Sequence, residues 1–129
     1  MLLSLFAVAG CRVAPLYNVN DATFPLPAAP SQQLGMDDYR NAIVRAGANR
    51  GWVFEDVEPG HMIGKIAVRG KHFATVDVLF DQQQFSIVHK SSQNLNYDAS
   101  TNQIHPNYNS WVRLLQQDIQ TEIARINAT

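Results

Sequence analysis

The sequence predicts a two-layer α+β fold, in which two helices cover one face of a four-stranded antiparallel sheet. Apolar residues recur every three or four positions near residues 36–49 and 106–128, and they alternate with polar residues between residues 52 and 90. Only short turns separate the alternating segments, and parallel strands would need crossovers of about a dozen residues or more. The expected order of elements is therefore α-β-β-β-β-α, with the helices packed on the apolar face.

The first helix is expected to begin at Met36 or Asp37 and to end at Asn49. Acidic residues near its start suit the positive end of the helix dipole. Gly51 is the expected stop residue, because glycine readily adopts the left-handed conformation that follows many helices. The apolar stripe of this helix consists of Met36, Tyr39, Ile43 and Ala46.

Four strands are expected to follow, over residues 52–57, 62–69, 72–80 and 85–90. Turn sequences separate them, namely Pro59-Gly60, Gly70-Lys71 and Asp81-Gln82-Gln83. In the third strand one side is apolar and consists of Ala74, Val76, Val78 and Phe80. The four strands therefore form a meander.

A polar, Asn-rich loop is expected over residues 91–103, followed by a long helix from Pro106 or Asn107 to Ala128. Proline suits the first turn of a helix, where its missing N–H has no partner to lose. The apolar face of this helix contains Tyr108, Trp111, Val112, Leu115, Ile119, Ile123 and Ile126, with Glu122 at its border.

Residues 1–10, MLLSLFAVAG, are uncharged and lead directly to Cys11, the only cysteine. The segment Val8-Ala9-Gly10-Cys11 resembles a bacterial lipobox. That resemblance implies that residues 1–10 are a signal segment removed before Cys11, which then carries a diacylglycerol thioether and usually an N-acyl group. Several acyl chains anchor a protein firmly, at about 0.8 kcal/mol per buried CH₂. The alternative is a buried apolar strand or helix with an inert thiol.

Prolines at positions 15, 25, 27 and 30 lie among Asn, Asp and Ala with no helical period. Residues 11–34 are therefore expected to form an extended tether between the lipidated cysteine and a single domain at residues 35–129. About 20 extended residues would reach several tens of Å from a membrane. Tyr17, Val19 and Phe24 are the candidates for docking against one edge of the domain.

Several segments resemble a family of small bacterial envelope lipoproteins of uncharacterised function. They are Arg50-Gly51-Trp52, Val76-Asp77-Val78 with Phe85-Ser86-Ile87, and the pair SSQNLNYD (91–98) and IHPNYNSW (104–111). The resemblance implies a lipid-anchored envelope protein with the α+β arrangement above, and it supplies no enzyme activity. Arg12 replaces the Asp that retains some lipoproteins at the inner membrane, which favours the outer membrane, facing the periplasm.

The histidines invite a metal hypothesis, although their spacing matches no common zinc motif. If the hairpin pairs in the simplest register, His72 and His89 become cross-strand neighbours with Asp77 nearby. A metal-dependent enzyme or metal-binding factor using His72, His89 and His105 is therefore the alternative function. A hydrolase built from Ser91 or Ser92, His105 and Asp98 lacks a G-x-S-x-G motif. The sequence thus predicts no catalytic residue, no metal site and no cofactor.

The best candidate for a binding surface combines aromatic rings with hydrogen-bonding groups, as glycan and peptide sites do. Its residues are Tyr97, Asp98, His105, Asn107, Tyr108 and Asn109. The alternative is structural, because Asn and Asp also cap helices and fix loops, and Tyr108 and Trp111 can anchor the helix to the sheet. The predicted function is a noncatalytic envelope module that binds a protein or a cell-wall component. Ten Lys and Arg against eleven Asp and Glu, without a basic run, argue against nucleic acid.

Overall fold

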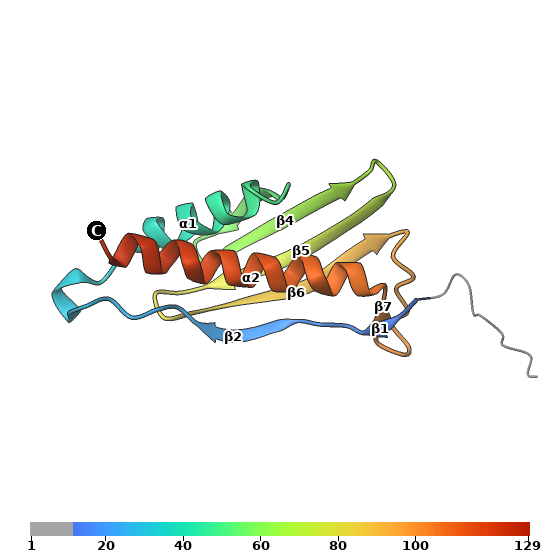
Figure 1. The fold of residues 1–129 in the computed structure, drawn as a ribbon, viewed down its shortest axis with the longest axis horizontal. Helices are drawn as coiled ribbons and strands as arrows, with labels where there is room; N and C mark the ends of the chain where they lie inside the picture. Colours follow the sequence, from blue (N-terminus) through green and yellow to red (C-terminus); the bar gives the residue numbers. More distant parts are fainter. Residues whose placement is uncertain (1–11) are drawn as a thin grey trace, which may run out of the picture.

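The computed structural model describes residues 12–129, so the expected signal segment and Cys11 lie outside the described residues. Figure 1 shows a layer of two helices lying on a twisted sheet, with the C-terminus at one end and β1 at the other. The elements in order are β1 (Ala14–Pro15), β2 (Val19–Thr23), the 3₁₀ helix η1 (Pro30–Gln32), α1 (Met36–Ala48), β3 (Val53–Glu58), β4 (His61–Val68), β5 (His72–Phe80), β6 (Gln84–Gln93), β7 (Gln103–Ile104) and α2 (Pro106–Asn127).

The predicted α+β class is confirmed, but the prediction of four strands is wrong. The main sheet has five antiparallel strands in the order β2-β6-β5-β4-β3, and β1 and β7 form a second, two-stranded sheet. The extra strand of the main sheet, β2, pairs with β6 through Val19 opposite Ile87 and Thr23 opposite Gln84. No proline falls within β2, so each of its residues keeps a backbone N–H for the ladder.

Residues 12–34 therefore differ from the extended tether expected from their prolines. Val19 and Phe24 are buried in the core, and Tyr17 packs against it. Phe24 stacks on the ring of Phe85 with the centroids 5.0 Å apart. The contacts expected for Tyr17, Val19 and Phe24 at one edge of the domain are present, and similar contacts extend over most of this segment. The folded unit therefore begins well before residue 35.

Both helices lie where their hydrophobic periods predict. Of the four residues in the predicted α1 stripe, three are buried together with Ala42 and Gly47, and Met36 is half-buried. Gly35 N donates to Asp38 Oδ2 over 2.9 Å at the start of the helix. Gly51 adopts φ +89°, as expected for a stop, although it lies two residues beyond the cap Asn49. The boundaries of α1 and α2 each match the sequence prediction to within one residue.

A single aromatic ring sets the contact between α1 and the sheet. Phe54 on β3 lies between Gly47 of α1 and Gly64 of β4, and a Cβ atom added at either glycine would overlap its ring. Glycine at both positions therefore lets the helix approach the sheet closely. Neither helix in residues 12–129 is both long and apolar enough to cross a membrane.

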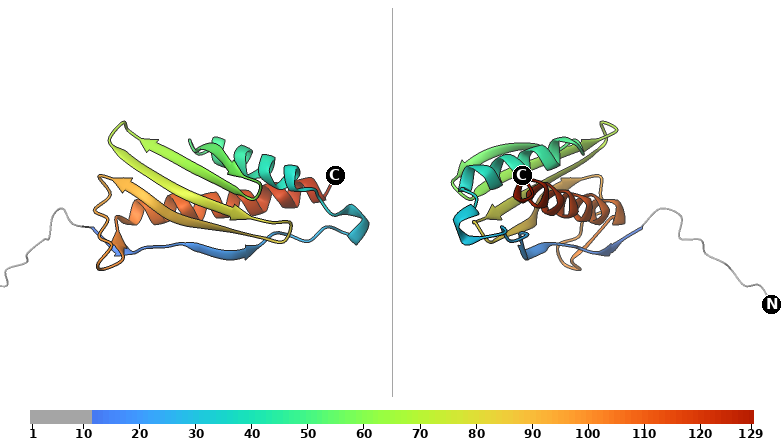
Figure 2. Two further views of the ribbon diagram at one scale, coloured as in Figure 1. Left: turned by 180° about the vertical axis from the view of Figure 1, so that it is seen from behind. Right: turned by 60° about the vertical axis from the view of Figure 1, so that its left-hand side comes forward.

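The two helices cover one face of the sheet, as predicted, and leave the other face open (Figure 2). On the covered side the core combines residues from β4, β5 and β6 with the apolar face of α2, including Met62, Val76, Ile87, Leu115 and Ile119. The open side follows the alternate residues of the same strands, including Phe73 and Leu79, which are partly exposed. The alternation of the sequence thus corresponds to the two faces of the sheet.

Candidate binding site

The predicted binding residues gather at the end of the molecule where β1 pairs with β7 (Figure 1). Residues 94–102 form a loop here, and a bridge between Asp98 and Gln103 closes its second half into a tight turn. Asn94, Asn96 and Asn102 have φ values of 59°, 53° and 54°. Asparagine tolerates this left-handed conformation better than most residues, so the Asn-rich composition has a conformational cause.

Three aromatic side chains meet behind this loop. The ring of His89 lies 4.2 Å from that of Tyr97 and 5.3 Å from that of Tyr108, measured between centroids. His89 comes from β6, Tyr97 from the loop and Tyr108 from the first turn of α2. Burial lowers the pKa of His89, so its imidazole is neutral at neutral pH, and its Nε2 lies 2.9 Å from Ser92 Oγ.

Tyr108 has a structural position rather than a ligand-facing one. Its side chain is fully buried, and its hydroxyl has no hydrogen-bond partner among the described residues. Burial raises the pKa of Tyr108 far above its ordinary value. The ring therefore anchors α2 to the sheet, as the structural alternative predicted. Trp111 is partly buried against the same core.

His105 and Asn109 also hold the fold together. The backbone N–H of His105 donates to Leu95 O over 2.7 Å, and its Nδ1 accepts from Asn107 N over 3.0 Å, which caps α2. Asn109 is the one fully buried polar residue among residues 12–129. Its Oδ1 accepts from Tyr17 N and its Nδ2 donates to Pro15 O, both over 2.9 Å, and we call these two bonds the Asn109 clamp.

Three of the six predicted residues remain exposed, namely Tyr97, Asp98 and Asn107. Tyr97 is 40% exposed, with one face of its ring against His89. The carboxylate of Asp98 accepts hydrogen bonds from Ser100 N and Ser100 Oγ, and these bonds lower the pKa of Asp98. The surface available to a ligand is therefore smaller than the sequence predicted and centres on Tyr97.

The histidines of the metal hypothesis do not converge. The expected pairing of His72 with His89 is wrong, because Val76 lies opposite His89 and a bulge follows at the next position. His72 Nδ1 lies instead 2.9 Å from Asn94 O, and His105 caps a helix. Within residues 12–129, no three His, Cys, Asp or Glu side chains are arranged to hold a metal ion.

The sequence interpretation missed a histidine–carboxylate pair on the open face of the sheet. His61 Nε2 lies 2.8 Å from Asp77 Oδ1, and Lys90 Nζ lies 3.9 Å from Asp77 Oδ2. The three-residue turn Arg69-Gly70-Lys71 pairs Ile63 with Asp77 and so places His61 and Asp77 on the same face. The two-residue turn expected at Gly70-Lys71 would have shifted this register by one residue and hidden the pair. Asp77 thus pairs with His61 rather than with the histidines of the metal hypothesis.

A cleft of about 310 Å³ opens at the other end of the molecule, between the start of α1 and the β3–β4 turn. Three acidic side chains, Asp37, Asp56 and Glu58, line it together with apolar residues such as Met36 and Phe80. The one basic side chain in the rim, Arg40, is bound by the carboxylate of Asp56 over 2.9 Å and 2.7 Å. None of the residues predicted from the sequence for binding lies in this cleft.

The sequence matches no protein-family model, and comparison with curated proteins and with solved structures finds no significant relative.

Proposed function

We propose that this chain is a noncatalytic lipoprotein of the bacterial cell envelope. In this proposal acyl chains on Cys11 anchor it in a membrane, with the outer membrane facing the periplasm as the favoured location. The loop around Tyr97 contacts another component of the envelope. The resemblance of residues 8–11 to a lipobox and of residues 91–111 to envelope lipoproteins supports this proposal.

The Asn109 clamp is the observation that carries the proposal. It fixes Pro15 and Tyr17 to the body within a few residues of Cys11. A modification at Cys11 would therefore be coupled to the whole folded body through a short connection. This geometry suits an anchored protein, in which the body must be held at the surface that its anchor enters.

A noncatalytic role is favoured by the way in which the candidate catalytic groups are used. Asp98 fixes a turn through Ser100, His105 caps α2, and Ser92 is bonded to His89. A hydrolase needs a serine, a histidine and a carboxylate in one chain of hydrogen bonds. In the described residues, Asp98 and His105 are instead bonded to different partners.

The intact mass of the protein isolated from native membranes tests the anchor. We expect a chain that starts at Cys11, with the mass of residues 11–129 increased by a diacylglycerol and an acyl group. The matched control is Cys11→Ser, which leaves residues 12–129 unchanged and is expected to keep residues 1–10 and to leave the membrane fraction. A native chain that retains residues 1–10 and carries no acyl group would overturn the proposal.

A further inference from the structure

Three basic side chains lie at the same end of the molecule as the exposed ring of Tyr97. Arg12 lies two residues before the start of β1, while Arg69 and Lys71 lie in the turn between β4 and β5. Hydrogen bonds join the three segments at this end. Asn94 Nδ2 donates to Lys71 O over 2.6 Å, and Leu16 N donates to Asn102 O over 2.9 Å. We call Arg12, Arg69, Lys71 and Tyr97 the basic end.

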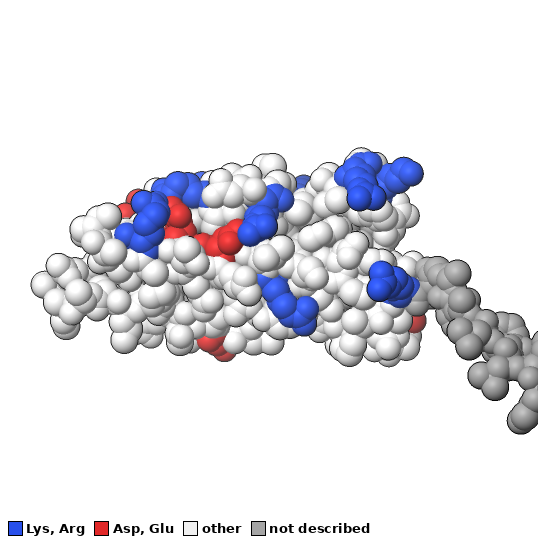
Figure 3. Space-filling view, in the orientation of Figure 1, with Lys and Arg blue, Asp and Glu red and all other residues white. Residues whose placement is uncertain are grey.

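The basic end carries little opposing charge. Asp98 is the acidic residue in its loop, and none of the three basic side chains forms an ion pair within residues 12–129. Figure 3 shows basic side chains at this end of the body. Val13 and Tyr97, each 40% exposed, add apolar surface beside the charges.

The opposite end of the molecule carries an excess of acidic side chains. Its turns and the start of α1 carry Asp37, Asp38, Glu58 and Asp81, while its basic side chains Arg40 and Arg125 are paired with Asp56 and Glu122. Two hydrogen bonds hold these segments together, from Gln82 Nε2 to Leu34 O and from Phe80 N to Gly60 O, both over 2.9 Å. A formal charge of −1 thus conceals a separation of charge along the length of the molecule.

The chain outside the described residues enters at the basic end. Cys11 precedes Ala14 by three residues, and Ala14 is paired with Ile104 in the two-stranded sheet. Three residues of fully extended chain span at most about 11 Å. A lipid on Cys11 would therefore hold the basic end at the membrane surface, and not several tens of Å away as a free tether would.

We propose that the basic end binds the surface of an anionic phospholipid bilayer. This inference rests on the lipid anchor of the proposed function, and it names the component that the loop around Tyr97 contacts. Basic side chains near an anionic surface are attracted to its headgroups, and tyrosine rings favour the interface between headgroups and acyl chains. The acidic end is repelled by the same surface, so the long axis stands away from the membrane with the acidic cleft outermost.

Fluorescence of the lipidated full-length chain in vesicles tests this orientation. An environment-sensitive fluorophore is attached to Ala99→Cys in the loop or to Gln83→Cys at the acidic end, while the thiol of Cys11 is blocked as a thioether. In phosphatidylcholine vesicles containing phosphatidylglycerol, we expect a blue-shifted emission at position 99 and none at position 83. The shift should weaken at high salt and in phosphatidylcholine alone. Equal emission in both kinds of vesicle would overturn the proposal.

A matched pair of charge reversals identifies the residues responsible. Lys71→Glu at the basic end should weaken the response to phosphatidylglycerol, measured as the blue shift at position 99, about fivefold or more. The reason is that each Lys or Arg near an anionic surface strengthens binding by about that factor. Lys65→Glu changes the net charge equally in the middle of β4, and it should leave the response unchanged. Both side chains are exposed, and thermal unfolding shows whether each variant is folded. Equal responses in the two variants would contradict a role for the basic end.

Separate measurements test the lipid anchor on Cys11 and membrane binding by the basic end. The mass of the native chain shows whether Cys11 is lipidated. If Cys11 proves unmodified, co-sedimentation of the full-length Cys11→Ser chain with the same vesicles still tests whether the basic end binds them. Binding that requires phosphatidylglycerol and is lost in Lys71→Glu would support the lipid surface as the partner. No binding, or binding to an envelope protein with no dependence on phosphatidylglycerol, would overturn it.

Discussion

Two neighbouring side chains in the first turn of α2 differ in how their buried polar groups are satisfied. Asn109 uses both ends of its amide, accepting from Tyr17 N and donating to Pro15 O. Tyr108 buries its hydroxyl without a partner among the described residues. An unsatisfied buried polar group costs about 1–3 kcal/mol of stability. The ring of Tyr108 therefore stabilises the core, while its unpaired hydroxyl destabilises the folded state.

Replacing Tyr108 by Phe should therefore leave the free energy of unfolding unchanged or raise it by about 1 kcal/mol, because the variant removes an unpaired hydroxyl and keeps the ring. Urea unfolding followed by circular dichroism measures the effect. Tyr17→Phe is the matched control. It removes a hydroxyl that donates to Gln116 Oε1 and should lower the free energy of unfolding by about 0.5–1.5 kcal/mol. A clear loss of stability in Tyr108→Phe would show that its hydroxyl has a partner.

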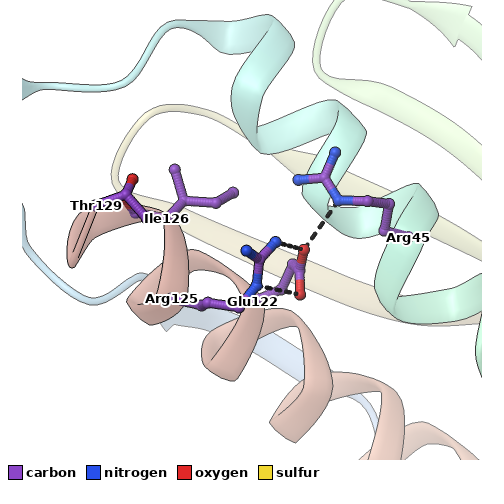
Figure 4. A network of polar contacts seen from close by, with 5 residues as sticks. All are labelled: Arg45, Glu122, Arg125, Ile126 and Thr129. Atoms are coloured by element: carbon purple, nitrogen blue, oxygen red, sulfur yellow. Dashed lines mark hydrogen bonds and ion pairs between the residues drawn. The ribbon is translucent and has the colours of Figure 1, made fainter.

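At the scale of elements, a carboxylate joins the two helices. Figure 4 shows Glu122 of α2 between Arg45 of α1 and Arg125 of its own helix. Arg45 Nε donates to Glu122 Oε1 over 2.9 Å, and the Glu122 side chain is 17% exposed. Hydrogen bonds from Arg125 and then Arg45 lower the pKa of Glu122 from 4.5 to about 2. A second ion pair, over 2.7 Å, joins Asp118 of α2 to Arg50, which follows the end of α1.

The stability that Glu122 adds should depend on pH. Because its pKa is lower in the folded state, its contribution is complete above about pH 4.5 and is lost as the pH falls towards 2. Glu122→Gln should lower the free energy of unfolding by about 1 kcal/mol at pH 7, since the arginines are largely solvated, and the difference should vanish near pH 2. Urea unfolding across this range measures it. Glu55→Gln removes an exposed carboxylate on β3 and should show no such dependence.

At the scale of the whole molecule, the N-terminal segment completes the sheet. Without β2, the backbone groups of β6 along Gln84 to Ile87 would form an exposed strand edge, which favours aggregation. The core would also lose Val19 and Phe24. The segment is therefore part of the folded unit.

A chain shortened to residues 35–129 distinguishes a packed segment from a tether. A tether could be removed without loss, whereas we expect the shortened chain to unfold at a markedly lower temperature and to associate at concentrations where residues 12–129 are monodisperse. Thermal unfolding and light scattering measure these two effects. The matched comparison is the chain of residues 12–129, because it lacks only residues 1–11 and keeps every residue that the structure describes. An unchanged unfolding temperature would contradict the structural role of β2.

The sequence by itself determined the two helices with their apolar stripes, the segments of β3 to β6, and the apolar face of β5. These features depend on local periodicity, since 3.6-residue and 2-residue repeats place side chains on one face whatever the rest of the chain does. The lipobox resemblance is equally local and remains a prediction. For the candidate site, the sequence named residues that the fold gathers at one end, but it could not separate exposed Tyr97 from buried Tyr108 and Asn109.

Tertiary structure alone decided the fifth strand, the histidine contacts and the separation of charge. β2 buries only Val19 fully among otherwise exposed or half-buried residues, so its own sequence shows little alternation, and it forms a strand because β6 offers an unpaired edge. The distance between His72 and His89 depended on the register of the hairpin, which places Val76 and not His72 opposite His89. Arg12, Arg69 and Lys71 are far apart along the chain, and they share one end only because the turns and β1 are brought together there. Contacts between distant segments depend on how the whole chain packs, which no local pattern encodes.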